Sequence, residues 1–281
     1  MKFYDRLIKC IREGFFPPVC LKCRRIYKIP NDAYNNARML YQHADADLRK
    51  KNHFRSLISA YLCTPCISDF NPVKSPQCSR CGLMFKSREG TDHVCGTCLK
   101  ADNYYNKARA FAIYNGVFKD LIPCYKYQNK LQLVKPFSFF LFSAFRNYWD
   151  NNAIDIITPV PLHIRRMRKR GFNQAYQLVH NWRKVAQAFN CDLTPIRIER
   201  EILVRTRWTQ PQVGMKLKDR QANIKNAFAV KIPEKVKGQR ILLIDDVITS
   251  GATVNECAKV LLNHGARHVD VLTLAQANKF W

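Results

Sequence analysis

Long apolar runs and acidic residues are both scarce in this chain of 281 residues. No apolar run approaches the roughly 18–20 residues that a membrane-spanning helix needs, which argues against an integral membrane protein. The first residues, MKFYDRLIKCIREGFFPP, interleave charges with apolar residues and lack the apolar region and cleavage site of a signal peptide. We therefore expect a cytoplasmic protein whose first residues form an amphipathic helix that ends before Pro17.

Aspartate and glutamate number 21, against 47 lysines and arginines, which gives a formal net charge of +26. Such an excess favours a polyanionic partner, with nucleic acid first and an anionic membrane surface second. A surface that is basic only for solubility is the simpler alternative.

The sequence also lacks the thioredoxin-like context in which cysteine pairs act as redox dithiols. Eight of its twelve cysteines instead form four C-x2-C pairs within the first hundred residues. Two such pairs supply the four thiolates of one tetrahedral zinc site. We predict two structural zinc ions, bound by Cys20, Cys23, Cys63, Cys66, Cys78, Cys81, Cys95 and Cys98. Sequential pairing into sites is the simplest arrangement, and an interleaved pairing stays open.

The remaining cysteines are scattered, and we expect small core side chains in a reducing compartment at Cys10, Cys124, Cys191 and Cys257. His93 lies close to the second set of cysteine pairs. Because four thiolates already complete that set, we expect His93 to be a loop residue rather than a ligand.

From about residue 108 the pattern changes, and short apolar runs alternate with segments of helical periodicity. The runs predict strands at 108–115, 153–162, 201–206, 227–231, 240–245 and 268–276, and the segments between them predict helices at 133–149, 171–189 and 252–266. Continuous apolar strands that alternate with helices are typical of an α/β domain with a mostly parallel sheet. Residues 137–140, Tyr125 and Tyr127 lie in helical context and are expected in the core.

Asp245 and Asp246 directly follow the apolar run ILLI, and VITSGAT then leads into a predicted helix. Ligands of open parallel sheets bind outside the carboxyl ends of the strands. A glycine-containing turn that opens a helix offers free backbone N–H groups to a phosphate. Two carboxylates would repel that phosphate unless they faced sugar hydroxyls or Mg²⁺. The stretch therefore predicts a site for a phosphorylated sugar.

Two further segments are rich in arginine. The run at 165–170 suits phosphate groups of a pyrophosphate or a nucleic-acid backbone, although a solvated helix face is the alternative. Asn173 is expected to cap the following helix. Residues 205–223 show no hydrophobic period and predict a long mobile loop that closes over substrate. Trp208 in this loop either stacks on a base or anchors packing. Candidates there for phosphate or ligand contacts are Arg205, Arg207, Arg220 and Asn223.

The segment ILLIDDVITSGAT matches the phosphoribosyl pyrophosphate (PRPP) motif of type I phosphoribosyltransferases. PVPLHIRRMRKRGFNQA, RTRWTQPQVGMKLKDRQANIKNAF and the cysteine-pair module ahead of them resemble the competence protein ComF family, which includes the ComFC and GntX-like proteins. The resemblance covers nearly the whole chain. It implies a double zinc-ribbon module at residues 1–103, followed at 104–281 by a type I phosphoribosyltransferase-like α/β domain with a mostly parallel sheet and flanking helices.

The resemblance also implies roles for individual residues. Asp245 and Asp246 would contact the ribose hydroxyls of PRPP, which Mg²⁺ would accompany. The 5′-phosphate would be held by Thr249, Ser250, Gly251, Ala252 and Thr253. Contacts to pyrophosphate or DNA are expected from Arg165, Arg166, Arg168, Arg170, Arg205 and Arg207.

Members of this family are cytoplasmic proteins needed for natural transformation or for use of external DNA. We therefore predict a DNA-uptake protein that handles incoming single-stranded DNA and binds PRPP or a related phosphosugar. Its expected partners include a DNA translocase or a recombination mediator, which would bring it to the inner face of the membrane. The sequence shows neither a recognisable nucleobase segment nor an obvious general base, so catalysis is left open. The alternatives are an active phosphoribosyltransferase on a small acceptor and a zinc-ribbon regulator that senses PRPP.

Overall fold

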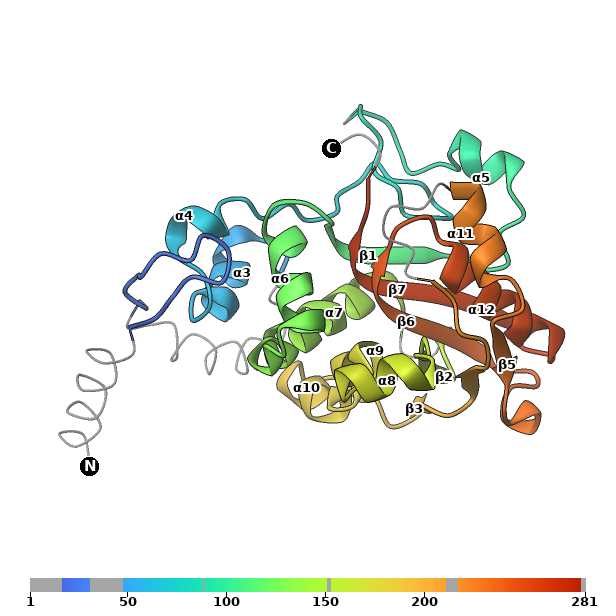
Figure 1. The fold of residues 1–281 in the computed structure, drawn as a ribbon. Helices are drawn as coiled ribbons and strands as arrows, with labels where there is room; N and C mark the ends of the chain where they lie inside the picture. Colours follow the sequence, from blue (N-terminus) through green and yellow to red (C-terminus); the bar gives the residue numbers. More distant parts are fainter. Residues whose placement is uncertain (1–16, 31–47, 88, 151–152, 211–216, 279–281) are drawn as a thin grey trace.

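The computed structural model describes residues 17–30, 48–87, 89–150, 153–210 and 217–278. At its centre lies a five-stranded parallel sheet in the order β1-β7-β6-β2-β3 (Figure 1). Its strands are β1 (Ala108–Ile113), β2 (Ile156–Pro159), β3 (Arg197–Ile198), β6 (Arg240–Ile248) and β7 (His268–Gln276). The predicted α/β fold with a mostly parallel sheet is thereby confirmed.

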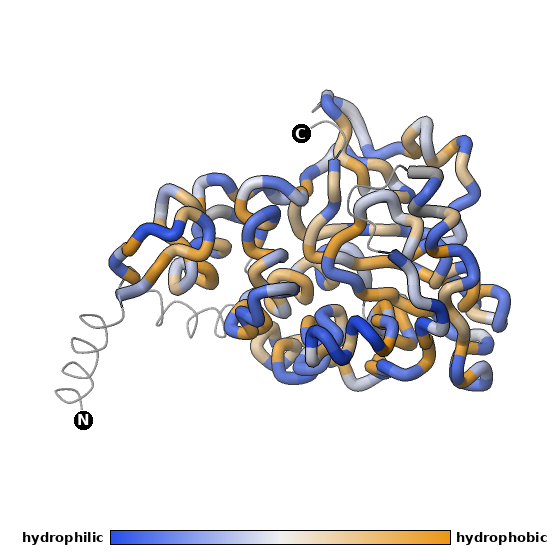
Figure 2. The backbone as a smooth tube through the Cα atoms, viewed as in Figure 1, coloured by the Kyte–Doolittle hydropathy of each residue, from blue (hydrophilic) through white to orange (hydrophobic). Residues whose placement is uncertain are grey.

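Helices cover both faces of this sheet, because alternate residues of its strands point to opposite sides. On β6, Leu242 and Ile244 belong to one buried cluster, whereas Ile241 and Leu243 belong to another. The first face packs against α7 (Val134–Tyr148) and α9 (Gln174–Val179), and the second packs against α12 (Ala252–Asn263). Figure 2 shows hydrophobic residues along the strands and hydrophilic ones along α8 (Ile164–Arg170).

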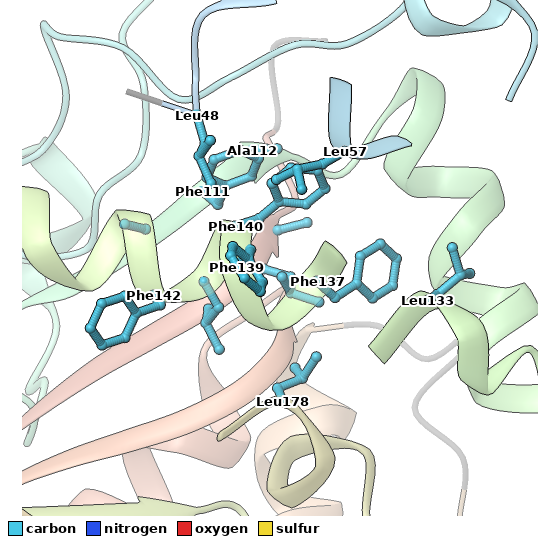
Figure 3. Packing of buried hydrophobic residues seen from close by; sticks show 14 of the residues in the cluster. Leu48, Leu57, Phe111, Ala112, Leu133, Phe137, Phe139, Phe140, Phe142 and Leu178 are labelled. Carbon is cyan, nitrogen blue, oxygen red and sulfur yellow. The ribbon is translucent and has the colours of Figure 1, made fainter. Parts of the chain in front are cut away.

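An aromatic cluster fills the first face, and Figure 3 shows side chains of α7 at its centre. Phe140 stacks on Phe111 of β1 with ring centroids 4.8 Å apart, and on Phe54 at 4.9 Å. Residues 137–140 and Tyr125 are buried, as predicted. The prediction for Tyr127 is wrong, because this last residue of α6 (Gly116–Tyr127) leaves 69% of its surface exposed.

The cysteine-rich part of the chain contains three short helices, α3 (Lys51–Ile58), α4 (Thr64–Ile67) and α5 (Gly96–Lys100). Phe54 of α3 is fully buried and stacks on Phe70 at 3.7 Å as well as on α7. The first cysteine set therefore shares one hydrophobic core with the α/β part, and α6 lies beside α3 and α4 (Figure 1). The domain boundary at residue 103 stays a prediction.

Two predicted segments differ in detail from the structure. The helix expected at 171–189 divides into α9 and α10 (Trp182–Ala188), because Asn181 between them is a poor helix former with φ −101° and ψ 12°. As predicted, the Asn173 side chain caps α9 and accepts from the N–H groups of Ala175 and Tyr176.

The expected loop at 205–223 contains α11 (Leu217–Ile224), which lies against α12. Next to it, β4 (Leu203–Arg205) and β5 (Phe228–Val230) form a separate antiparallel pair. The described residues also include 3₁₀ turns at Leu131–Leu133 and Pro233–Lys235. The expected N-terminal amphipathic helix lies outside the described residues. No described helix is both long and apolar enough to cross a bilayer.

Candidate functional site

A cavity of about 540 Å³ opens at the carboxyl ends of β2 and β6. Both predicted acids line it, and Asp246 is 2% exposed. The backbone N–H of Asp246 donates to Oδ1 of Asp245 at 2.8 Å, which holds the Asp245 side chain against the backbone. Within the described part of the chain, Oδ2 of Asp246 is buried without a hydrogen-bond partner. Such an oxygen can accept from a ligand hydroxyl or bind a cation.

Lys126 of α6 lies in the same cavity, with its Nζ atom 2.7 Å from Oδ1 of Asp246. Burial alone would lower the pKa of Lys126, but Asp246 and Asp245 outweigh burial and raise it. Burial, followed by the charge of Asp246, raises the pKa of Asp245 to about 8, although Lys126 opposes both effects. The acidic pair therefore has a built-in counterion that the sequence analysis missed.

Three of the predicted arginines, Arg166, Arg170 and Arg205, line the same cavity as the acids. Burial, assisted by the charge of Arg166, lowers the pKa of Arg205 to about 10. Its Nη2 atom donates to the hydroxyl of Thr209, whereas its Nε is buried without a partner among the described residues. Arg166 donates to the carbonyl of Thr209 at 3.0 Å. These guanidinium groups are placed to meet phosphate oxygens inside the cavity.

The other predicted arginines lie outside the cavity lining. Arg165 and Arg168 are exposed on α8. Arg207 donates to the carbonyls of Asn223 and Lys225, at 2.9 and 2.6 Å, and so holds the end of α11. Asn223 itself donates to the carbonyl of Gln210. The side chain of Arg220 lies outside the described part.

Trp208 packs on α8 through its ring. The guanidinium carbons of Arg165 and Arg166 lie 5.7 and 5.3 Å from ring centroids of Trp208, and the His163 ring lies edge-on at 5.3 Å. In this structure Trp208 is a packing anchor, one of the two roles expected for it.

The predicted phosphate loop has two sides. Thr249 and Thr253 line the cavity, whereas Ser250, Gly251 and Ala252 line a second hollow of about 530 Å³. Gly251 has φ 77°, a left-handed conformation that glycine adopts without strain, and it starts α12. The first turn of α12 thus borders the cavity that holds the acids and the arginines. A ligand that carries both hydroxyl and phosphate groups fits this distribution of charge.

The eight paired cysteines gather into two clusters of four, each with its sulfur atoms within 4.8 Å of one another. One cluster contains Cys20, Cys23, Cys63 and Cys66, and the other contains Cys78, Cys81, Cys95 and Cys98. The structure therefore has the sequential pairing, and each cluster can hold a metal ion. Four thiols at such distances fit a tetrahedral ion.

The second cluster also shows how the backbone prepares a thiolate. The N–H groups of Cys81 and Cys95 donate to the sulfur of Cys78 at 3.4 and 3.3 Å. Burial raises the pKa of Cys78, but these backbone donors outweigh it and lower the pKa to about 7. His93 is no member of either cluster, since its ring stacks on Phe85 at 4.1 Å and its Nδ1 contacts the carbonyl of Thr91.

The scattered cysteines largely follow their prediction. Cys124 and Cys257 are buried, and Cys191 is partly buried. Cys10 lies outside the described residues.

Sequence reasoning missed Tyr114, Lys126, Tyr127 and Gln174, all of which line the cavity. Lys126 and Tyr127 end a helix far from the acidic pair in sequence, and no local motif marks them. Only the tertiary fold, which brings the end of α6 to Asp246, places them at the site.

Comparisons with known proteins agree with this geometry. The family described as "Phosphoribosyl transferase domain" matches residues 182–280. Competence protein F of Haemophilus influenzae is 30% identical, covering 77% of this chain and 97% of its own length. Competence protein ComFC of Streptococcus pneumoniae is 32% identical, with 76% and 87% covered. DNA utilization protein YhgH of Escherichia coli K12 is 29% identical, with 76% and 90% covered.

Proposed function

Because this chain belongs to the competence protein F family, we propose that it acts in DNA uptake, handling incoming single-stranded DNA while its phosphoribosyltransferase-fold cavity binds PRPP. The names of its relatives, competence proteins and DNA utilization proteins, support the role in DNA uptake. The cytoplasm is the compartment that suits this role. A DNA translocase or recombination mediator is the partner that we expect to hand over the strand at the inner face of the membrane.

The cavity of mixed charge carries the PRPP part of the proposal. Among the described residues, Asp246 offers a carboxylate oxygen without a hydrogen-bond partner, and Arg166 and Arg205 offer guanidinium groups in the same cavity. A ribose that bears a phosphate and a pyrophosphate has hydroxyls that can donate to the carboxylate, and phosphate oxygens that can accept from the guanidinium groups. Mg²⁺ bound with PRPP would neutralise part of the pyrophosphate charge beside Asp245 and Asp246.

The two cysteine clusters support zinc as the structural metal. Four cysteine thiolates and no free position are the usual ligand set of a structural zinc site. We propose one zinc ion in each cluster.

The charge of the chain supports the DNA part. A net charge of +26 and the exposed arginines of α8, among them Arg165 and Arg168, suit a phosphate backbone. Binding through phosphates alone would have no sequence preference.

The test is titration calorimetry with PRPP and Mg²⁺, beside fluorescence anisotropy with labelled single-stranded DNA. Two charge-assisted hydrogen bonds contribute about 1.5–3 kcal/mol each, so Asp245→Asn with Asp246→Asn should weaken PRPP binding by about a hundredfold or more. DNA binding should stay equal or rise slightly, because negative charge is removed from a basic surface. Glu234→Gln, an exposed acid in a turn away from the cavity lining, is the matched control. Unchanged PRPP affinity in the double variant would refute the assignment of the cavity.

An active phosphoribosyltransferase on a small acceptor is the second candidate. A further hollow of about 600 Å³ adjoins the cavity, shares Arg205 with it and contains the rings of Phe172 and Tyr176. It offers room for an acceptor next to bound PRPP. Release of pyrophosphate from PRPP upon addition of candidate acceptors would favour this activity, and its absence with single-stranded DNA present would favour binding alone.

A further inference from the structure

Tyr127 is a large aromatic side chain left open to solvent at the cavity. It ends α6, directly after Lys126, and 69% of its surface is exposed. Tyr125, two residues earlier, is fully buried and donates its hydroxyl to the carbonyl of Gln174 at 2.8 Å. Tyr127 therefore contributes little to the core, and its ring is available to a ligand.

Cationic side chains from two separate parts of the chain lie at this end of α6. The guanidinium carbon of Arg170 lies 5.1 Å from the ring centroid of Tyr127. Arg24, in the hairpin of the first cysteine cluster at residues 19–26, donates to the side chain of Gln128, the residue after Tyr127, at 3.1 Å. Arg25 is exposed beside Arg24 in the hairpin. Figure 1 shows α6 between the helices α3 and α4 and the sheet.

Two acids close to this surface already have cationic partners. Asp120 of α6 lies 3.7 Å from Nζ of Lys22, which also pairs with Asp69. Asp246 pairs with Lys126 inside the cavity. The arginines around Tyr127 are therefore the charges that a phosphate backbone would meet.

An exposed aromatic ring beside basic groups is an arrangement by which proteins bind single strands. Bases of a single strand offer their faces for stacking, whereas those of a duplex are stacked on each other. We propose that Tyr127 is a stacking platform for one base of single-stranded DNA, whose backbone runs from Arg24 and Arg25 past Arg170 onto α8. This assignment rests on the proposed function and gives its DNA-binding part a location.

The experiment compares Tyr127→Ala and Tyr127→Phe with the unchanged protein by fluorescence anisotropy, using a labelled thymidine oligonucleotide and an abasic oligonucleotide of equal length. Loss of one stacked base should weaken binding of the thymidine strand by about 5- to 100-fold in Tyr127→Ala. Tyr127→Phe should keep nearly full affinity, because it keeps the ring. The abasic strand has the same phosphates but nothing to stack, so the Tyr127→Ala protein should bind it as the unchanged protein does.

Tyr104→Ala is the matched control. Tyr104 is also exposed and also lies near a cation, with Nζ of Lys259 5.5 Å from its ring centroid, but it borders the hollow behind the phosphate loop. Its replacement should leave binding of both strands unchanged.

Three results would overturn the platform. The first is that Tyr127→Ala binds the thymidine strand as tightly as the unchanged protein does. The second is that Tyr127→Ala loses as much affinity for the abasic strand as for the thymidine strand, which would indicate a change of fold or charge. The third is that Tyr104→Ala loses as much affinity as Tyr127→Ala. If the unchanged protein bound no single-stranded DNA, the proposed function would fail together with the platform. Vesicles of anionic phospholipid provide the last arm, and binding to them that depends on Tyr127, without binding of DNA, would assign the surface to a membrane instead.

Discussion

Asp245 links the candidate site to the pH dependence of stability. Its pKa is about 8 in the folded protein, whereas an aspartate in an unfolded chain titrates near 4. Between these pH values the folded state holds a proton that the unfolded state has lost. Asp245 therefore makes the folded protein progressively less stable as the pH rises from about 4 to about 8.

Asp245→Asn should remove this dependence, because an amide stays neutral throughout. We expect its melting temperature to exceed that of the unchanged protein by at least about 2 °C at pH 8, and by much less at pH 5, where only about one of the four pH units has been crossed. Thermal unfolding followed by circular dichroism across this pH range measures the difference. A variant that is less stable than the unchanged protein at pH 8 would contradict the raised pKa.

Lys126 is expected to matter because it compensates a buried charge. Lys126→Met leaves Asp246 buried without its cation, which should cost about 3–5 kcal/mol in the free energy of unfolding. Urea unfolding measures this loss. Asp246→Asn added to Lys126→Met should recover much of it, since no charge is then left unpaired. A double variant as unstable as the single one would mean that Lys126 acts through packing alone.

At the scale of elements, the first cysteine cluster and α7 share aromatic packing. Phe54 lies in the insert between Cys23 and Cys63, and it stacks on Phe140 of α7. Unfolding of the first cysteine cluster should therefore loosen the packing on the first face of the sheet, where α7 lies. The second cluster is tied to β1 differently, because the buried Arg109 donates to the carbonyls of Cys78 and Ser79.

Elemental analysis of the unchanged protein, purified without chelator, should give two zinc ions per chain. Cys20→Ser should reduce this to about one, and because metal binding contributes about 10–16 kcal/mol in such sites, the hairpin should unfold. Hydrogen exchange should then become faster in α7 and stay nearly unchanged in α12, on the opposite face. An increase in exchange that is confined to residues 17–30 would contradict a hydrophobic core shared by the first cysteine cluster and α7.

At the scale of the whole molecule, the positive charge predicts salt-dependent binding of single strands. Each phosphate contact contributes about 0.7 to the slope of log affinity against log salt concentration. Arg165 and Arg168 are exposed on α8 and outside the cavity lining, so replacing both by alanine should make the slope less negative by about 1.4.

The control for this measurement is Lys237→Ala with Arg267→Ala. Both residues are exposed and precede β6 and β7, at the amino ends of these strands, whereas the cavity lies at the carboxyl ends. An equal change of slope in both pairs would mean that DNA contacts the basic surface without a preferred face.

Much of the fold could be predicted because its signals are local in sequence. The run ILLI, the acids after it and the turn at Gly251 lie within one segment, so the strand, the site and the helix start follow from it. The spacing of the cysteine pairs likewise predicts their clusters. Lys126 and Tyr127 could not be found in this way, because periodicity gives the helix but not which turn faces a cavity. The break at Asn181 was missed because the apolar pattern continues through it.

The place of β7 in the sheet has a consequence for how the chain is made. β7 lies between β1 and β6, and in the described part of the chain it is the strand with which β1 pairs, as in Ala108 beside Val271. β1 is synthesised long before β7, so this apolar strand lacks its pairing partner until most of the chain has left the ribosome. The cysteine clusters are complete by residue 98, and they can bind metal before β7 is synthesised. We therefore expect a partly folded intermediate in which the clusters bind their proposed zinc ions before the sheet is complete.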